Sequence, residues 1–327
     1  MHKAFLIYNP ASGRRRERRA EKISRAAEVL RAAGVQAEIS ATTGKGSAIQ
    51  QTQHAAAQGF DTIIACGGDG TVNEVLNGLM LSSAPATLGV IPLGSGNLMA
   101  TDLDLPRDCE AAARRLLNYQ PREIKPGVIT YQSRAGQQKR WFVVAAGVGA
   151  DAELMYRTAV GVKERYGMYA YFAEMARMAW RGHFPMFNVE WQNEPEAQGE
   201  AGQRRQASVA LVMAVRANRF PAVMRLVRLG CELTQNRYRL MLFRTDKVFP
   251  FINFFFSVVT GRNWKVKQVD LADSTWFRCT PQSTVASAIH CEADGENLGK
   301  LPVEVSIDQR TFSLLMPPMN KNAEVSP

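Results

Sequence analysis

The sequence predicts two domains, an α/β domain with a parallel sheet followed by a mostly antiparallel, β-rich domain. The length of 327 residues exceeds the usual size of a single hydrophobic core. Short apolar runs alternate with helical patterns in the first third, and from about Lys125 onward β segments follow one another between polar breaks. We therefore assign residues 1–125 to the first domain and 126–309 to the second, and expect residues 310–327 to return to the first.

The composition indicates an ordinary globular protein with anionic partners. Apolar residues make up 46% of the chain and charged residues 21%. The net charge of +10, from 40 Lys and Arg against 30 Asp and Glu, favours nucleotides, anionic lipid surfaces or nucleic acid as partners. Five scattered cysteines without a CxxC spacing predict reduced, mostly buried thiols rather than disulfides or a zinc site.

Neither export nor a membrane span is expected. The first residues, MHKAFLIYNPASG, hold too short an apolar stretch for a signal peptide. The longest apolar run, Val248–Val259, has about 12 residues, whereas a spanning helix needs about 20. We expect a cytoplasmic protein that touches a membrane without crossing it.

The first domain begins with alternating strands and helices. Apolar residues recur at helical spacing from Ala20 until Gly34 ends the pattern. The strands predicted around the helical segments are Ala4–Tyr8, Val35–Ser40, Thr62–Cys66 and Thr87–Ile91. Such a series forms a parallel sheet with helices on both faces, and ligands lie beyond the carboxyl ends of its strands.

Three loops follow those strand ends: Asn9–Gly13, Gly67–Thr71 and Gly94–Asn97. The second of them leads into a helix and offers bare peptide N–H groups at a helix N-terminus, which suits phosphate. A carboxylate beside phosphates favours Mg²⁺ between them, so Asp69 is the candidate metal ligand. The alternative is a plain βα turn in which the glycines serve only the tight bend.

The second domain is predicted as a run of β segments with one helical insert, residues 151–180. The polar stretch Asn193–Gln206 is predicted as a solvent loop between two strands. The predicted strands are Gly127–Tyr131, Trp141–Ala146, Phe187–Trp191, Ser208–Val215, Tyr238–Phe243, Trp264–Leu271, Thr275–Cys279 and Val303–Ile307.

The motif GGDGTVNEV, Gly67–Val75, resembles the signature of the diacylglycerol kinase catalytic domain superfamily, which includes sphingosine and ceramide kinases and is related to the NAD kinases. Further segments agree with the family in order along the chain: NPASG at Asn9–Gly13, Thr43 with Gly44, IPLGSGNLMATDLDLP at Ile91–Pro106, AAGVGADAELM at Ala145–Met155, KERYGMYAYF at Lys163–Phe172 and CEADGE at Cys291–Glu296. The resemblance implies that ATP binds in a cleft between the α/β domain and a β-sandwich domain, and that its phosphoryl group passes to a lipid hydroxyl.

The resemblance also implies roles for individual residues. Asp294 or Glu296 would accept the hydroxyl proton, and the sequence does not decide between them; the alternative for this segment is an exposed hairpin turn. ATP and Mg²⁺ would be held by the loops of the first domain. The implied nucleotide-binding residues are Asn9, Thr43, Gly67, Gly68, Asp69, Gly70, Thr71, Asn73, Glu74, Ser95 and Asn97, with Asp69 beside the metal.

The sequence departs from the family pattern at three places. Leu98 follows Asn97 where the family often has Asp, and Arg219 follows Asn218 where the family has glycines. The family's acidic segment, which holds a structural metal in some bacterial members, is replaced by Gln235–Arg239. A second metal site is therefore not expected.

Basic and apolar segments suggest contact with a lipid surface. Arg216, Arg219, Arg225 and Arg228 alternate with apolar residues, as suits anionic headgroups, although a folded strand with exposed arginines fits as well. Val248–Val259 is predicted either as a lipid-facing helix or as a core helix. The run of arginines from Arg14 to Arg19 lies either near the ATP phosphates or on a solvated helix face.

We therefore predict an ATP-dependent lipid kinase, peripherally associated with the inner membrane face. The expected acceptor is diacylglycerol, and then ceramide or a sphingoid base. The alternatives are an NAD kinase-like enzyme, which shares the GGDG turn, and a catalytically silent lipid-binding regulatory protein. A nucleic-acid partner is disfavoured because no reading module accompanies the positive charge. The sequence gives no indication of the oligomeric state.

Overall fold

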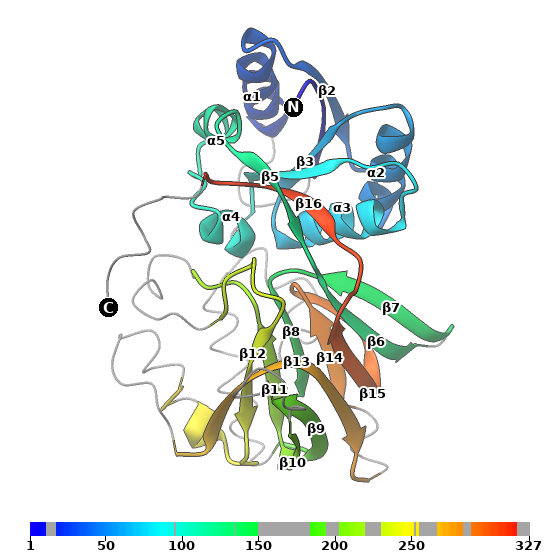
Figure 1. The fold of residues 1–327 in the computed structure, drawn as a ribbon, viewed down its shortest axis with the longest axis vertical. Coiled ribbons are helices and arrows are strands. Elements are labelled where there is room, and N and C mark those ends of the chain that lie inside the picture. The colour runs from blue at the N-terminus through cyan, green and yellow to red at the C-terminus, as the bar shows by residue number, and fades with distance from the viewer. Residues whose placement is uncertain are drawn as a thin grey trace. The chain divides into compact units, whose positions relative to one another are not determined.

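The computed structural model consists of two compact units, Met1–Ile124 together with the chain from Thr311, and Lys125–Arg310 (Figure 1). Each unit is built on one sheet. The structure describes residues 1–10, 18–94, 96–133, 135–149, 184–193, 203–219, 230–251, 253–254, 267–283 and 289–318.

The sheet of the first unit is mostly parallel. Its order is β2-β1-β3-β4-β16-β5, and only the pair β16–β5 is antiparallel. The strands are β1 (Lys3–Tyr8), β2 (Gln36–Ala41), β3 (Thr62–Gly67), β4 (Thr87–Pro92), β5 (Gln120–Ile124) and β16 (Phe312–Met316). The four strands predicted here are confirmed to within one residue at each end, because glycine, proline or a polar residue ends each apolar run.

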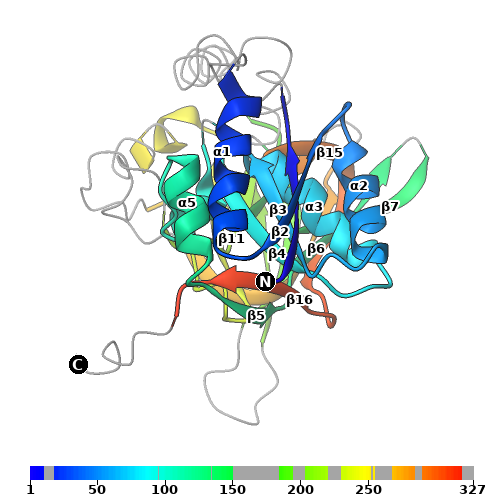
Figure 2. The same ribbon diagram turned by 90° about the horizontal axis from the view of Figure 1, so that it is seen from above.

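Helices cover both faces of this sheet, as predicted. Figure 2 shows α1 and α5 on one face and α2 and α3 on the other, and the contacts pair them in the same way. The helices are α1 (Arg19–Ala32), α2 (Ser47–Ala57), α3 (Asp69–Leu81), α4 (Leu98–Asp102) and α5 (Cys109–Leu116). Helix α1 buries Ile23, Ala26, Ala27 and Leu30, and Gly34 follows its end at φ 85°, a conformation that glycine adopts without strain.

The strand order creates a switch point between β1 and β3. These two strands are neighbours, yet the chain leaves β1 toward β2 on one side and leaves β3 toward β4 on the other. Their following loops therefore diverge above the sheet, which is where α/β sheets bind ligands. Tyr8 and Cys66 pair at this edge, so Asn9 and Gly68 begin the two diverging loops.

The sheet of the second unit is antiparallel throughout, and it closes on itself. Its order is β10-β9-β13-β12-β11-β8-β14-β15-β6-β7, and a further pairing of β13 with β15 joins six of these strands into a closed circuit. The strands are β6 (Gly127–Ser133), β7 (Gly136–Phe142), β8 (Ala145–Gly149), β9 (Phe187–Asn193), β10 (Arg204–Val209), β11 (Leu211–Val215), β12 (Tyr238–Phe243), β13 (Val269–Pro281), β14 (His290–Ala293) and β15 (Glu296–Ile307).

Strand alternation separates two apolar clusters in this unit. Tyr238, Leu240 and Leu242 of β12 belong to the inner cluster, whereas Met241 and Phe243 belong to a second one. Val248, Phe251 and Phe254 pack into the second cluster from a helical segment that the structure describes at 248–251 and 253–254. These residues of the predicted apolar run are core residues, while Phe249 is 84% exposed. The remainder of Val248–Val259 lies outside the described residues.

The predicted strand Trp141–Ala146 is wrong as one strand, because the chain bends at Val143 and Val144 between β7 and β8. The predicted strand Ser208–Val215 likewise divides at Ala210, whose N–H donates to the Phe243 carbonyl at 3.0 Å.

Other predictions shift at their ends. The predicted strands Trp264–Leu271 and Thr275–Cys279 are joined in β13, which continues through an irregularity after Ser274, and residues 264–266 lie outside the described residues. The loop predicted at Asn193–Gln206 is shorter, because β10 already begins at Arg204. The predicted helical insert 151–180 lies outside the described residues.

The thiol prediction is confirmed, because all five cysteines are free and buried. In the part of the chain that the structure describes, no helix has both the length and the apolar character needed to cross a bilayer.

Candidate nucleotide-binding loops and acidic hairpin

The glycine turn after β3 leads directly into α3. Gly68 is the N-cap residue of this helix, with φ −90° and ψ −175°, and its carbonyl accepts the N–H groups of Thr71 and Val72 at 3.0 and 3.1 Å. The first N–H groups of a helix lack partners within the helix and attract anions. The turn therefore places a helix N-terminus at the carboxyl edge of β3, beside the switch point.

Two glycines of the loops are required by close packing. A Cβ atom on Gly94 would lie 2.5 Å from the Gly68 Cα and 2.8 Å from the Asn97 Oδ1, and one on Gly67 would overlap the Thr71 side chain. Gly68 differs from both, because its Cβ would make an ordinary contact of 3.4 Å with the Gly94 Cα, and its φ suits any residue. Packing alone therefore does not require glycine at position 68. A ligand that approaches the Gly68 peptide closely would require it, because a side chain would stand in its way.

Asp69 and Asn97 bind peptide groups of the loop between β4 and α4. The Asp69 Oδ1 accepts the Met99 N–H at 3.1 Å. Asn97 is buried in the left-handed conformation, with φ 52°; its Oδ1 accepts the Gly94 N–H at 2.9 Å and its Nδ2 donates to the Gly94 carbonyl at 2.7 Å. These side chains fix the loop. Ser95 lies outside the described residues.

Glu74 performs the same task for the loop that precedes α2. Its Oε1 accepts the Gly46 N–H at 2.8 Å and its Oε2 accepts the Ala48 N–H at 3.1 Å. Glu74 is buried, whereas Thr43 is exposed in this loop and donates its N–H to the Ser47 Oγ at 3.1 Å. The carboxylate thus holds the start of α2 and supports an exposed turn that carries Thr43.

The other predicted nucleotide-binding residues divide between the loops and the interior. Thr71 and Asn73 are buried, and the Asn77 Nδ2 donates to the Asn73 Oδ1 at 3.1 Å. Asn9 donates its N–H to the Cys66 carbonyl at 3.3 Å and lies at the switch point. Gly67 ends β3, Gly68 is the N-cap residue, and Asp69 and Gly70 begin α3.

The arginines near the first loop differ in their exposure to solvent. Arg19 is buried and donates from its Nη1 to the Pro10 carbonyl at 2.9 Å, so this guanidinium lies on the loop after β1, whereas Arg18 is exposed. Residues 11–17, with Arg14, Arg15 and Arg16, lie outside the described residues.

The acidic segment of the second unit forms a tight hairpin between β14 and β15. Asp294 and Gly295 have φ values of 48° and 80°, the positive values that a two-residue hairpin loop of this type requires. The Asp294 Oδ2 accepts the Val143 N–H at 3.0 Å, and its Oδ1 accepts the N–H groups of Val144 and Ala145 at 2.9 and 3.0 Å. The alternative of an exposed turn is wrong for Asp294, which is only 6% exposed.

The bend between β7 and β8 explains where these donors come from. Val143 and Val144 lie outside both strands, so their N–H groups are available to the carboxylate. The Glu292 Oε2 accepts the Gly295 N–H at 2.9 Å and fixes the other side of the hairpin. The sequence did not predict the bend at Val143 and Val144 or the hydrogen bond of Glu292, because no local pattern marks the bend that supplies the donors.

Glu296 lies one residue beyond the turn, in a different environment. Its Oε2 pairs with the Arg140 Nη2 at 3.3 Å, and both side chains remain 16% exposed. A carboxylate that is partly open to solvent can exchange a proton with a bound molecule, whereas the Asp294 carboxylate is enclosed by peptide donors.

Arg216 is fully buried, so its predicted place on a lipid-facing surface is wrong. Its guanidinium donates to the carbonyls of Lys125, Leu233 and Gln235, the last two at 3.2 and 3.4 Å, and its backbone N–H donates to the Val144 carbonyl at 2.9 Å. Burial lowers the pKa of Arg216 to about 10, against the opposing influence of Asp294. Arg219 is exposed, and Arg225 and Arg228 lie outside the described residues.

Arginines flank an aspartate at the segment Gln235–Arg239, where no second metal site is expected. The Arg239 Nε lies 2.9 Å from the Asp273 Oδ1, and the Arg237 Nε lies 3.8 Å from the Asp273 Oδ2. The hydrogen bond from Arg239 to Asp273 raises the pKa of this guanidinium. Across the described residues, no group of three His, Cys, Asp or Glu side chains is placed to hold a metal.

Comparisons with known proteins show what the segment that carries these loops is similar to. Residues 3–129 match the model of the diacylglycerol kinase catalytic domain. A diacylglycerol kinase from Bacillus subtilis is 37% identical over 179 residues, which cover 54% of this chain and 56% of that protein. A diacylglycerol kinase from Staphylococcus haemolyticus is 30% identical over 198 residues, covering 61% and 57%. The matches thus span little more than half the length of these curated relatives.

Solved structures share the fold along the whole chain. The crystal structure of a diacylglycerol kinase from Bacillus anthracis superposes with a TM-score of 0.67 at 17% identity, covering 97% of both chains. A second structure from the same organism gives a TM-score of 0.70 at 19% identity, with the same coverage. At this level of identity the likeness concerns the fold alone, and it confirms the predicted pairing of an α/β domain with a β-rich domain.

Proposed function

We propose that the protein is an ATP-dependent lipid kinase of the diacylglycerol kinase catalytic domain superfamily, whose model matches residues 3–129. The observation that supports it most is Gly68, whose bare peptide lies at the start of α3 although packing does not require glycine there. A triphosphate is the ligand that such a helix start and the neighbouring loops suit.

The side chains of the loops position backbone rather than contact phosphate in this proposal. Asp69, Glu74 and Asn97 each bind peptide groups of a neighbouring loop. Phosphoryl transfer depends on positioning and on charge stabilisation more than on covalent chemistry. Loops held in this way are preorganised, so binding the triphosphate orders less of the chain.

Mg²⁺ would accompany ATP and offset the charge of its phosphates. Mg²⁺ in such sites keeps several waters and uses one or two carboxylates besides the phosphates, so one protein carboxylate is sufficient. Asp69 is the described residue that would hold it, with Oδ1 already bound to the Met99 N–H. The guanidinium groups beside Asp273 oppose a further cation there.

Glu296 is the proposed general base, and Asp294 is a positioning residue. Three peptide N–H groups stabilise the ionised Asp294 carboxylate, which makes it a poor proton acceptor. Glu296 pairs with Arg140 and its side chain is 16% exposed, so it is the better candidate to take the proton of an acceptor hydroxyl. Asp294 would hold the start of β15 and thereby Glu296.

The proposed acceptor is diacylglycerol, with ceramide or a sphingoid base second. The curated relatives carry the name of the first substrate, and the net charge of +10 suits a surface of anionic lipid. A cytoplasmic protein in peripheral contact with the inner membrane face fits this substrate, and the exposed Phe249 is a described residue that would enter the interface.

Incubation with γ-labelled ATP and vesicles containing diacylglycerol, ceramide or sphingosine, with NAD in a parallel reaction, tests the proposal. We expect label in the lipid fraction, highest with diacylglycerol. Label in NADP alone would support an NAD kinase-like enzyme instead. Binding of ATP without transfer to any acceptor would support the silent regulatory protein. This alternative is considered because Gln235–Arg239 replaces the acidic segment of the family.

A further inference from the structure

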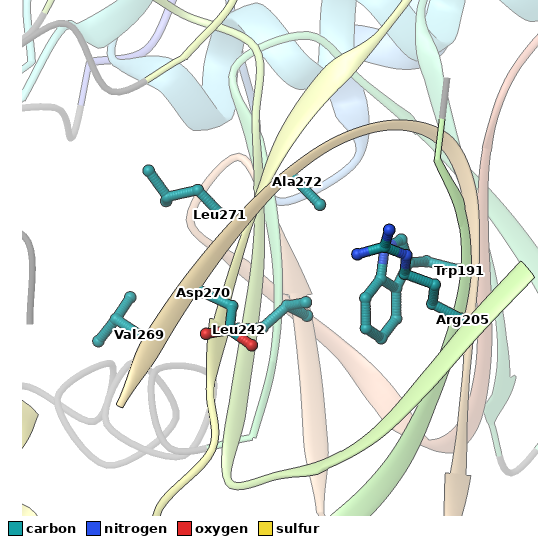
Figure 3. A pocket seen from close by; sticks show the side chains of 7 residues that line it. All are labelled: Trp191, Arg205, Leu242, Val269, Asp270, Leu271 and Ala272. Carbon is teal, nitrogen blue, oxygen red and sulfur yellow. The ribbon is translucent and has the colours of Figure 1, made fainter. Parts of the chain in front are cut away.

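The second unit contains a pocket of about 400 Å³ on its β-sheet. Figure 3 shows the side chains that line it, drawn from β9, β10, β12 and β13: Trp191, Arg205, Leu242, Val269, Asp270, Leu271 and Ala272. A pocket of this volume is large enough for a small ligand, and small-molecule sites combine apolar walls with a few polar groups.

Strand register explains why apolar and charged side chains meet in this pocket. Trp191 and Leu242 belong to the inner apolar cluster of the unit. Arg205 is the ladder partner of Trp191, and Asp270 is the ladder partner of Leu242. Directly opposed residues in a ladder project from the same face, so the two charged side chains rise beside the indole and the leucine. The pocket thus has a charged rim beside two core side chains, Trp191, which is 6% exposed, and Leu242, which is fully buried.

Two ion pairs balance other charges at or beside the rim, and the positive charge of Arg205 is not balanced by them. The Asp270 Oδ2 pairs with the Arg244 Nη1 at 3.0 Å, and the neighbouring Arg204 pairs with Glu190 at 3.3 Å. The Arg205 side chain is exposed and makes no hydrogen bond or ion pair with any residue that the structure describes. An anion is therefore the group that this rim is able to bind.

The pocket is separate from the acidic hairpin within the same unit. The hairpin contact lies at the level of Arg239 on β12. Asp294 binds the Ala145 N–H at the start of β8, Ala145 pairs with Val215, and Val215 pairs with Arg239. Leu242 lies three residues further along β12, about 10 Å at the rise of a strand. Fully buried side chains, including Leu240, fill the inner face between the two places. An occupant of the pocket would not reach Glu296 through the core.

We propose that this pocket binds an amphiphile with an anionic head and an apolar chain, such as a fatty carboxylate. The chain would lie against the accessible edge of Trp191, and the head would bind Arg205. A neutral amphiphile lacks the group that Arg205 binds, and a cationic one meets repulsion at the rim. The site requires neither ATP nor the proposed transfer reaction, so its test is independent of both.

Quenching of tryptophan fluorescence by ω-bromoundecanoate, below its micelle concentration, tests the site in the full-length protein. We expect saturable quenching that disappears in Trp191→Phe. The alcohol ω-bromoundecanol, of equal length but uncharged, should bind roughly tenfold more weakly, the worth of one charge-assisted hydrogen bond.

A pair of neighbouring arginines supplies the matched control. Arg205→Ala should raise the Kd of the carboxylate roughly tenfold and leave that of the alcohol unchanged. Arg204→Ala should change neither by more than about twofold, because Arg204 is already paired with Glu190. Both side chains are exposed, so both variants are expected to keep their circular dichroism spectra.

Three results would overturn the proposal: quenching that does not saturate, quenching that persists in Trp191→Phe, or equal effects of Arg204→Ala and Arg205→Ala on carboxylate binding.

Discussion

The glycine turns of the first unit and the acidic hairpin of the second use peptide N–H donors in opposite ways. At Gly68 the start of α3 is half-buried, and its N–H groups suit an anion from solution. At the hairpin, three N–H groups already bind an anion of the protein itself, the carboxylate of Asp294. We propose that the first arrangement receives a ligand, whereas the hydrogen bonds of the second hold it fixed.

This difference assigns separate tasks to residues that look alike in the sequence. Asp69, Glu74 and Asp294 are all acidic residues of conspicuous motifs, yet each one binds backbone N–H groups. Glu296 instead pairs with a side chain and keeps some exposure. The carboxylates of Asp69, Glu74 and Asp294 stabilise the two regions, and that of Glu296, which pairs with Arg140, is the one proposed to act on substrate.

The largest effect on stability is expected from Asp294→Asn. The amide replaces one acceptor oxygen by a donor that faces peptide donors, and the free energy of unfolding should fall by about 3 kcal/mol. Urea denaturation measures this loss. Glu296→Gln is the control and should cost less than about 1 kcal/mol, because its ion pair is partly solvated. Equal losses in the two variants would contradict the distinction between these carboxylates.

Gly94→Ala and Gly68→Ala should separate packing from ligand binding. The methyl group at Gly94 would force backbone apart, because its nearest atom is the Gly68 Cα at 2.5 Å, and stability should fall by about 2 kcal/mol. Gly68→Ala should leave the melting temperature almost unchanged but weaken ATP binding about tenfold or more, since the methyl covers the peptide. Calorimetric titration with ATP and thermal melts of both variants measure the two effects.

The reverse result, in which Gly68→Ala unfolds and Gly94→Ala keeps its stability, would contradict this distinction. Glycine would then be needed at position 68 for the backbone bend and not for ligand binding.

Glu74→Gln should produce a smaller loss of stability in the first unit. The amide keeps one acceptor for the N–H groups of Gly46 and Ala48 but loses the charge at the start of α2, about 1 kcal/mol in all. Glu28→Gln on the exposed face of α1 is the control, expected within about 0.5 kcal/mol of the parent. Denaturation curves that coincide for the two variants would refute a role of Glu74 in fixing this loop.

The effect that is smallest at neutral pH concerns the thiol that flanks the hairpin. Burial raises the pKa of Cys291 to about 12, so the folded protein keeps this proton while the unfolded chain releases it from about pH 8.5. The stabilising influence is complete below pH 8.5 and falls as the pH rises toward 12, by up to about 1.4 kcal/mol per pH unit.

Cys291→Ala should therefore flatten the decline of stability above pH 8.5, as measured by urea denaturation at several pH values. A decline of the same slope in the parent and the variant would show that other groups cause it.

Local patterns predicted β1 to β4 of the first unit well, because each apolar run there is ended by a glycine, a proline or a polar residue. They missed β5, whose sequence QPREI is mostly polar. They failed at Val143 and at Ala210, where the bends depend on partners distant in sequence. The Val143 N–H binds Asp294 and the Ala210 N–H binds the Phe243 carbonyl. No window of neighbouring residues contains such a partner.

The loops of the candidate site were predicted from their glycines, whereas the tasks of the side chains were not. Asn97 and Glu74 were expected at the nucleotide, and their side chains bind peptide groups of the loops instead. Arg216 was placed on the surface because arginine is seldom buried, yet three carbonyls receive its guanidinium. Hydrogen bonds between distant segments decide these roles.

The most direct test compares phosphoryl transfer and ATP binding in Glu296→Gln and the parent protein. With labelled ATP and diacylglycerol vesicles, transfer by the variant should fall about 100-fold or more, while the Kd for ATP measured by calorimetry stays within about twofold. Transfer at the rate of the parent would contradict the assignment of Glu296 as the base, and with it the division between carboxylates that fix backbone and the one that acts on the hydroxyl.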